Sequence, residues 1–182
     1  MNRRKALKVM GGALIVAAGG AGYFAATRTP RRALAPWEEA GAERFVDPRM
    51  RALSYAVLAP NPHNRQPWLI ELDEQGGLTL RFDQARQLPH TDPFDRQLTI
   101  GLGCFLELLK MAANADGYAV DIDLFPEGTD PDGLTSAVVA TATFKKDNAI
   151  ASDPLWSHVM DRRSNKEPFD ITKAVKGGDL AN

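Results

Sequence analysis

The stretch from Ala59 to Trp68 constrains the fold more than any other part of the sequence. Three prolines fall within eight residues, at positions 60, 62 and 67. Proline fixes its own backbone φ angle, cannot donate a backbone hydrogen bond and disfavours a helical residue before it. The stretch therefore predicts a stiff, extended loop between a helix and a strand.

The side chains between these prolines are rich in amides. Asn61, His63, Asn64 and Gln66 donate and accept hydrogen bonds without carrying a fixed charge. Such a loop suits the edge of a flat heteroaromatic ligand, where donors and acceptors alternate. A plain proline-rich turn that only joins a helix to a strand is the alternative that composition leaves open.

A second polar cluster lies near the other end of the chain, between Asp161 and Asp170. Within five residues it supplies two arginines, a serine and a lysine, at positions 162, 163, 164 and 166. Arginine gives planar, charge-assisted hydrogen bonds, and lysine adds a mobile point charge. These are the donors that a phosphate group needs, although a solvated basic patch would have the same composition.

Together the two motifs resemble those of the nitroreductase-like flavoproteins. The loop is similar to the proline–polar–Asn–x–Gln–Pro–Trp signature of that family, and the later cluster is similar to its Arg-Arg-Ser-x-Arg/Lys phosphate motif. The resemblance implies an FMN cofactor and no catalytic residue supplied by the chain itself. It implies that Asn61, Asn64 and Gln66 lie against the flavin ring. The full set of expected cofactor-binding residues is Asn61, His63, Asn64, Gln66, Arg162, Arg163, Ser164 and Lys166.

The order of the motifs resembles one branch of that family. In ordinary nitroreductases the arginine motif comes first, and two subunits share each flavin. Here the loop comes first, as in the double-length exported branch, often called Acg-type, in which two nitroreductase-like halves are fused. The resemblance implies an α+β half-domain over residues 36–160, with an antiparallel sheet packed on a long central helix. Residues 161–182 would then begin a truncated second half, so a dimer or the missing half is expected to complete the site.

The first 35 residues resemble a twin-arginine export signal. The basic segment Arg3-Arg4-Lys5 precedes an apolar run from Val9 to Ala26 that contains five glycines. This implies transport to the periplasm of a protein already folded around its cofactor. The run is also long enough to span a bilayer, so an anchor in the inner membrane is expected if the signal is not cleaved. Ala33-Leu34-Ala35 has the small-x-small form of a cleavage site, and Pro36 follows it directly.

Composition excludes several other functions. The chain of 182 residues is long enough for one domain with a real core, and its net charge of -1 gives no field to attract nucleic acid. Its one cysteine, Cys104, excludes an internal disulfide and is expected to be a small buried hydrophobe. The three histidines lack the close spacing of zinc ligands, so no metal is expected. The expected partner is a small-molecule substrate.

Periodicity predicts the elements that carry the two motifs. Residues 30–46 show little periodicity and are expected to be a linker. Asp47 as N-cap, with Pro48 at the first helical position, predicts a helix that runs to residue 59. Asp153 and Pro154 predict a later helix in the same way. A last helical turn is expected after Asp170 and is expected to end at Gly177-Gly178. Strands are predicted over residues 68–72, 78–82, 119–125 and 136–144, the first two as a hairpin that begins with Trp68 in the core.

The strongest pattern predicts a long helix that Asp92 and Pro93 open and Gly117 ends. One face is apolar throughout: Leu98, Leu102, Phe105, Leu106, Leu109 and Ala113. Gly101 and Gly103 lie inside this helix, and each costs about 1 kcal/mol relative to alanine. Their presence indicates that another helix or a ligand packs close to the helix backbone there.

Three functions are compatible with these features. The first is an exported FMN-dependent oxidoreductase that transfers hydride from reduced nicotinamide or another donor to a nitro or quinone-like acceptor. The second is a non-catalytic protein that sequesters or stores FMN. The third is an inactive, truncated fragment.

Overall fold

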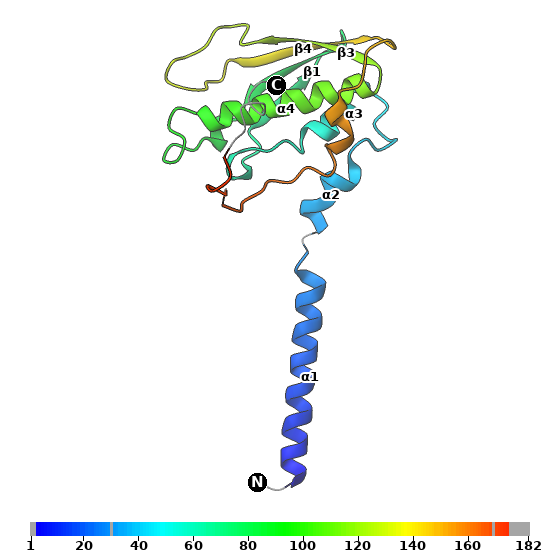
Figure 1. Ribbon diagram of the computed structural model, residues 1–182, viewed down its shortest axis with the longest axis vertical. Coiled ribbons are helices and arrows are strands. Elements are labelled where there is room, and N and C mark those ends of the chain that lie inside the picture. Colours follow the sequence, from blue (N-terminus) through cyan, green and yellow to red (C-terminus); the bar gives the residue numbers. More distant parts are fainter. Residues whose placement is uncertain (1–2, 30, 169, 175–182) are drawn as a thin grey trace.

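The computed structural model describes residues 3–29, 31–168 and 170–174 (Figure 1). In this part of the chain the helices are α1 (Arg3–Thr27), α2 (Arg31–Glu39), α3 (Pro48–Ala56) and α4 (Arg96–Ala115). The strands are β1 (Trp68–Leu72), β2 (Gly77–Phe82), β3 (Tyr118–Leu124) and β4 (Val138–Lys146). Short 3₁₀ helices cover Pro62–Asn64, Gln84–Arg86 and Pro154–His158.

The strands form one antiparallel sheet in the order β1-β2-β4-β3. β1 and β2 form the predicted hairpin, in which Trp68 lies opposite Phe82. Along β2, Leu78, Leu80 and Phe82 are buried, whereas the residues between them are partly exposed. Because side chains alternate between the faces of a strand, one face of the sheet packs on the helices.

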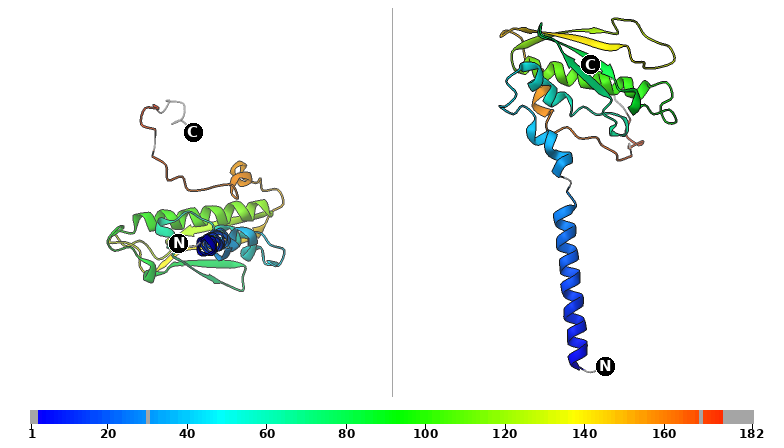
Figure 2. Two further views of the ribbon diagram at one scale, coloured as in Figure 1. Left: turned by 90° about the horizontal axis from the view of Figure 1, so that it is seen from below. Right: turned by 180° about the vertical axis from the view of Figure 1, so that it is seen from behind.

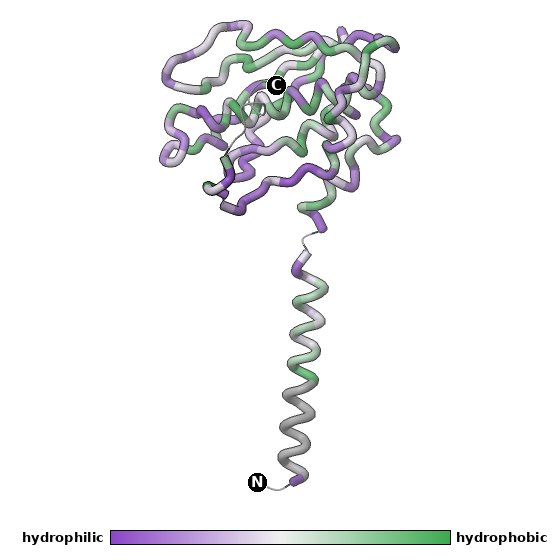
Figure 3. The backbone as a smooth tube through the Cα atoms, viewed as in Figure 1, coloured by the Kyte–Doolittle hydropathy of each residue, from purple (hydrophilic) through white to green (hydrophobic). Residues whose placement is uncertain are grey.

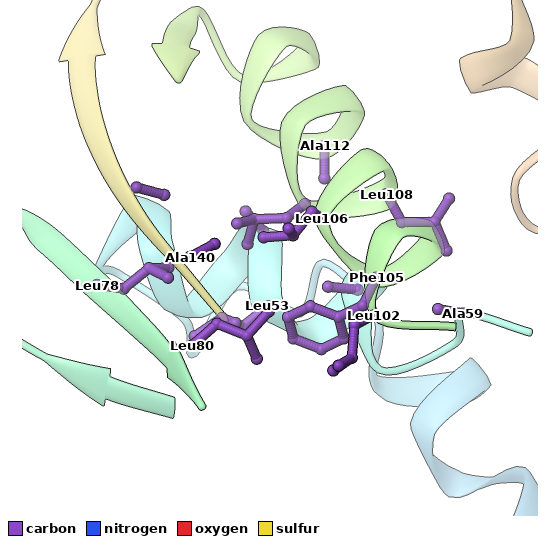
Figure 4. Close-up of a cluster of buried hydrophobic side chains, with 14 of the residues drawn as sticks. Leu53, Ala59, Leu78, Leu80, Leu102, Phe105, Leu106, Leu108, Ala112 and Ala140 are labelled. Atoms are coloured by element: carbon purple, nitrogen blue, oxygen red, sulfur yellow. The ribbon is translucent and has the colours of Figure 1, made fainter. Parts of the chain in front are cut away.

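α4 is the core helix of the domain and lies across the buried face of the sheet, with α3 packed beside it. Leu102 and Phe105 are at most 1% exposed, and Figure 4 shows them among side chains from the sheet and α3. The Trp68 ring packs on Phe105, with 4.8 Å between ring centroids, so the predicted core position of Trp68 is confirmed. α4 is long and apolar enough to cross a membrane, but most of it is buried within the domain.

This architecture confirms the predicted fold class. The structure is α+β, with an antiparallel sheet packed on a long central helix, and it is consistent with a nitroreductase-like half-domain. β1 and β2 lie on one side of α4, and the segment that follows the last 3₁₀ helix lies on the other side (Figure 2). The proline-rich loop leads directly into β1, and the arginine cluster follows the last 3₁₀ helix.

The start of α4 differs from the prediction. The helix begins at Arg96 rather than directly after Asp92, because Asp95 adopts a left-handed conformation with φ of 53° that turns the chain. Asp92 still satisfies the helix start, since its Oδ2 accepts a hydrogen bond of 2.9 Å from the backbone N–H of Leu98. The Oδ2 of Asp95 accepts one of 2.9 Å from Leu134, which ties the loop before β4 to this helix end.

The predicted ends of several other helices and strands were wrong by one helical turn or less. α3 ends at Ala56, three residues before the predicted position, and β4 begins two residues later than predicted. Asp153 caps only a 3₁₀ helix, through a hydrogen bond of 2.7 Å from the backbone N–H of Leu155 to its Oδ1. After Asp170 the chain makes a single hydrogen-bonded turn, in which the N–H of Lys173 donates to the Asp170 carbonyl at 3.2 Å, in line with the one turn predicted there. The helix stop predicted at Gly177 and Gly178 lies outside the described residues.

The expected linker over residues 30–46 was also wrong, because it contains the helix α2. α2 is tied to α3 through Gly41, whose N–H donates a hydrogen bond of 2.8 Å to Ser54 Oγ. Gly41 has a φ of +70°, and a Cβ there would overlap the Tyr55 hydroxyl, so only glycine fits this turn. Before α2, the helix α1 projects away from the domain (Figure 1).

The two glycines inside α4 have different environments. A Cβ on Gly101 would lie 3.2 Å from Asn61 Cβ and 3.3 Å from Pro62 Cδ, whereas one on Gly103 would meet no described atom within 4 Å. The group that packs against the helix backbone at Gly101 is therefore the proline-rich loop, and not another helix. Gly101 permits this close approach.

An alanine at each glycine tests this contact. Gly103→Ala should stabilise the protein by about 0.5–1 kcal/mol through helix propensity alone. Gly101→Ala should forfeit that gain and destabilise the fold, because the atoms it meets belong to a proline ring and a Cβ that cannot rotate away. Chemical denaturation of both variants measures the difference. Equal stabilisation by the two substitutions would contradict the packing described here.

A second tie joins the start of α3 to the β1–β2 turn. Asp47 Oδ1 caps α3 by accepting a hydrogen bond of 2.9 Å from the backbone N–H of Arg49. The Arg49 side chain pairs with Asp47 at 2.7 Å and donates to the carbonyl oxygens of Asp73 and Gly77 at 2.7 and 2.8 Å. Hydrogen bonds from the Arg49 side chain hold the pKa of Asp47 below its ordinary value of 3.8.

This pKa shift makes one part of the stability dependent on pH. Because the pKa of Asp47 is lower in the folded state, its contribution is complete above the unfolded value of 3.8 and is lost as the pH falls through the folded value. Asp47→Asn keeps a capping side chain but removes this contribution. The variant should be less stable than the parent at neutral pH and should converge with it in acid, as measured by urea unfolding at several pH values. Glu74→Gln, at an exposed turn position, should leave the pH profile unchanged.

Candidate functional site

The two predicted motifs meet at one polar cavity of about 540 Å³. We call residues 60–66 the proline loop and residues 161–168 the arginine segment. The volume lies within the range of about 300–1,000 Å³ that is usual for ligand sites. The cavity lining includes every predicted cofactor-binding residue except Arg163, together with residues that were not predicted: Ala33, Pro36, Trp37, Val57, Leu58, Ala59, Pro60, Asn61, His63, Asn64, Gln66, Arg162, Ser164 and Lys166.

The proline loop has a strained backbone. His63, Asn64 and Gln66 have φ angles of 50°, 51° and 50°, in the left-handed region that residues other than glycine rarely adopt. Such conformations persist only where the surrounding structure imposes them, and they concentrate at binding and catalytic sites. Three of them within four residues indicate that the loop is held in place to present its side chains.

Asn61 holds this loop from within. Its Nδ2 donates a hydrogen bond of 3.1 Å to the Ala59 carbonyl, and its Oδ1 accepts one of 2.8 Å from the Gln66 backbone N–H. The Asn61 amide therefore positions the loop. Within the described part of the chain, the side chains of His63, Asn64 and Gln66 make no hydrogen bond, so their polar atoms are available to a ligand.

Arg65 has a structural role at this loop. Its Nε donates to the Arg86 carbonyl at 2.9 Å, and its Nη2 donates to the Ala85 carbonyl at 3.0 Å. Arg86 returns a hydrogen bond of 2.7 Å to the Arg65 carbonyl. This exchange fastens the proline loop to the 3₁₀ helix that follows β2.

The arginine segment is hydrophilic along its length (Figure 3) and reaches the cavity from the 3₁₀ helix Pro154–His158. Trp156 packs edge-on against Tyr55, with 4.8 Å between ring centroids, and Val159 is buried. Arg162 Nη2 donates a hydrogen bond of 2.9 Å to the Leu58 carbonyl. Its Nε is buried and has no hydrogen-bond partner among the described residues, so an unused charged donor lies beside the cavity.

The structure does not bring Arg163 to the cavity. Its Nη1 donates to the carbonyl oxygens of Met160 and Arg162 at 2.8 and 2.7 Å, and its guanidinium lies 4.3 Å from the centre of the Trp37 ring. Arg162, Ser164 and Lys166 do line the cavity. The direct phosphate contact expected of Arg163 is thus replaced by a contact with α2.

α2 forms part of the cavity wall, which was not predicted from the sequence. Ala33, Pro36 and Trp37 occur at helical spacing and line the cavity on one face of α2. The lining contains two cationic side chains, Arg162 and Lys166, and no carboxylate among the described residues. The cavity therefore favours an anion locally, although the whole chain has a net charge of -1.

A second hollow of about 300 Å³ lies on the α4 side of the proline loop. It shares Pro60, Asn61 and Ser164 with the polar cavity and is otherwise lined mainly by α4, including Ile100 and Cys104. Cys104 packs against the core but is only half-buried, so it is less buried than predicted. Among the described residues, no group of three histidine, cysteine or acidic side chains is placed to hold a metal ion.

Comparison with known proteins links the chain to nitroreductases. The protein named "Putative NAD(P)H nitroreductase acg" of Mycobacterium tuberculosis is 31% identical over 120 residues, which are 65% of this chain and 36% of that protein. "Putative NAD(P)H nitroreductase Rv3131" of the same organism is 30% identical over 129 residues, or 71% of this chain and 36% of that protein. "Probable NAD(P)H nitroreductase PigM" of a Serratia species is 29% identical over 80 residues, or 43% of this chain and 22% of that protein. No family model matches the chain.

The chain spans about a third of the length of the first two of these relatives, 36% in each case. Identity near 30% to several proteins with this name supports a nitroreductase-like relationship. The similarity concerns this part of the relatives and does not extend to the rest of their length.

The positioning role of Asn61 can be separated from ligand contact. Asn61→Ala should destabilise the protein by about 1–2 kcal/mol, because two hydrogen bonds that hold the loop are lost. Gln66→Ala removes an amide from the same loop, but one without a hydrogen bond among the described residues, and should change the free energy of unfolding far less. Urea denaturation of both variants without ligand gives the comparison. Equal effects would contradict the role assigned to Asn61.

Proposed function

We propose that this chain binds FMN in the polar cavity and forms part of an exported, FMN-dependent oxidoreductase of the nitroreductase type. The proposed reaction moves hydride from a reduced nicotinamide, or another donor, to a nitro or quinone-like acceptor. One observation carries the proposal: the proline loop and the arginine segment, which lie far apart in the sequence, line the same cavity. The similarity to proteins named NAD(P)H nitroreductases supports the reaction type.

The residues around the cavity suit such a cofactor. A phosphate group carries close to two negative charges at neutral pH, and Arg162, Ser164 and Lys166 provide two cations and a hydroxyl. The buried Nε of Arg162, which has no partner among the described residues, is a donor that an anionic ligand would satisfy. The amides of Asn64 and Gln66, which make no side-chain hydrogen bond to the described part of the chain, offer donors and acceptors to the edge of a planar ring system.

The division of labour follows from these groups. A bound flavin supplies the hydride chemistry itself. The arginine segment would hold the phosphate, the proline loop would orient the ring, and Asn61 would keep that loop rigid. The chain need not supply an acid or base at the cavity, and His63 is accordingly assigned to binding.

The proposed partners follow from the part of the relatives that the chain covers. In this proposal a second half or a second copy of the chain docks beside the cavity and completes its wall. The exposed residues of α4 near the proline loop, Gln97 and Ile100, are available to such a partner. The proposed substrate is a small molecule.

We also propose export through the twin-arginine route, with α1 either cleaved or retained as an anchor in the inner membrane. Ile15, Val16 and Phe24 are between 67% and 75% exposed on a helix that projects from the domain. The 25 residues of α1 give a length of about 37 Å. That length exceeds the hydrocarbon core of a bilayer, about 30 Å.

The visible absorption spectrum and turnover of the purified full chain test the function. We expect stoichiometric FMN after reconstitution, followed by oxidation of NADH or NADPH when a nitroaromatic or quinone is added. A chain that stays colourless with excess FMN would overturn the proposal. Full FMN occupancy without turnover, even after a second half is supplied, would instead assign the protein to flavin storage.

The phosphate site has a matched pair of lysine variants. Lys166→Ala should weaken FMN binding about tenfold, because it removes a cation from the cavity lining. Lys173→Ala removes an exposed lysine that is absent from that lining and should leave the affinity unchanged. Titration of flavin fluorescence measures both. Identical affinities for the two variants would place the phosphate away from Lys166.

A further inference from the structure

Helix α2 supplies Trp37, the one tryptophan, tyrosine or phenylalanine among the described residues that line the cavity, and its ring also contacts the arginine segment. Trp37 is half-buried and lines the cavity beside Ala33 and Pro36. The guanidinium carbons of Arg163 and Arg162 lie 4.3 and 5.9 Å from the centre of its ring. Both distances fall within the range of about 6 Å for attraction between a cation and an aromatic face.

The arginine segment has few other attachments to the domain. It forms no helix or strand, and within the described residues Arg162 is its half-buried member while Arg163, Ser164 and Lys166 are exposed. The hydrogen bond from Arg162 to the Leu58 carbonyl is the long-range side-chain bond that fixes it. Arg163 is turned toward α2 by its bonds to Met160 and Arg162. The contact with the Trp37 ring is therefore a second interaction that holds the arginine segment, an otherwise mostly exposed stretch, against the domain.

We propose that Trp37 is a positioning residue for the phosphate-binding end of the cavity, and that α2 belongs to the binding site. The ring holds the two guanidinium groups, and through them it keeps Ser164 and Lys166 at the cavity wall. Arg163 then contributes to ligand binding through Trp37, without a contact of its own. This inference rests on the proposed binding of FMN.

Such a role has a signature that a general loss of structure would not produce. Riboflavin shares the ring system of FMN but lacks the phosphate. If Trp37 acts through the arginine segment, its removal should weaken the binding of FMN and leave the binding of riboflavin nearly unchanged. A ring that packed directly on the flavin would weaken the binding of both ligands by the same factor.

The test measures the dissociation constants of FMN and riboflavin for the full chain by titration of flavin fluorescence. Trp37→Ala should weaken FMN binding about tenfold and change riboflavin binding less than about twofold. Trp37→Phe should restore most of the FMN affinity, because it keeps an aromatic face. Glu38→Ala, at the exposed neighbouring position of α2, is the matched control and should match the parent for both ligands.

A double variant adds an independent readout. In a chain that already carries Arg163→Ala, the further change Trp37→Ala should cost little FMN affinity, since both residues act through the same contact. If Trp37→Ala reduces folding yield, Trp37→Leu keeps apolar volume without an aromatic face and takes its place. Circular dichroism of each variant confirms that the domain is folded.

The outcomes separate the two proposals. Unchanged FMN affinity in Trp37→Ala, or equal loss for FMN and riboflavin, overturns the positioning role and leaves FMN binding intact. Additive losses in the double variant also overturn it. A parent chain that binds neither FMN nor riboflavin overturns the proposed function, and the role of Trp37 with it.

Discussion

The close approach of the proline loop to the backbone of α4 is the constraint on which the site depends. Asn61 and Pro62 lie against Gly101, where a side chain on the helix would push the loop away. Three interactions then fix the loop: this contact, the hydrogen bonds of the Asn61 amide, and the exchange of hydrogen bonds between Arg65 and Arg86. A loop held this firmly can maintain left-handed residues at His63, Asn64 and Gln66, whose side chains line the cavity.

The parts of the fold that could be predicted from the sequence are those governed by periodicity and by local hydrogen bonds. The apolar stripe of α4, the alternation along β2 and the Asp47 cap depend on neighbours in the sequence, and the structure reproduces all three. The proline loop and the arginine segment line one cavity, although they lie about a hundred residues apart in the sequence. Whether those residues bind FMN stays a prediction.

The features that could not be predicted depend on contacts between distant residues. α2 is short and contains Pro36, so nothing local distinguishes it from a linker; its helical face becomes visible only once Trp37 meets the arginine segment. Asn61 and Asn64 are the same residue type, yet among the described residues the Asn61 side chain forms the hydrogen bonds that hold the loop and the Asn64 side chain forms none. The backbone geometry at each position decides this difference. The orientation of Arg163 is decided by an aromatic ring more than a hundred residues earlier in the sequence. Asp95 displaces the start of α4 through its left-handed backbone conformation, and its side chain accepts a hydrogen bond from Leu134, far along the sequence.

The location of α2 has a consequence for the proposed cleavage of the export signal. The small-x-small sequence Ala33-Leu34-Ala35 lies inside this helix and begins with a residue of the cavity lining, and the next two lining residues, Pro36 and Trp37, follow it directly. Proteolysis after Ala35 would leave those two residues at a frayed new terminus, with most of the helix before them gone. A peptidase and a bound ligand would thus compete for the same few residues. The folded helix would be a poor substrate for a protease that requires an extended chain, and the cleaved chain would bind the proposed ligand more weakly. Under the proposed export and FMN binding, cleavage that releases the domain from the membrane would weaken ligand binding, and a bound ligand would slow that cleavage.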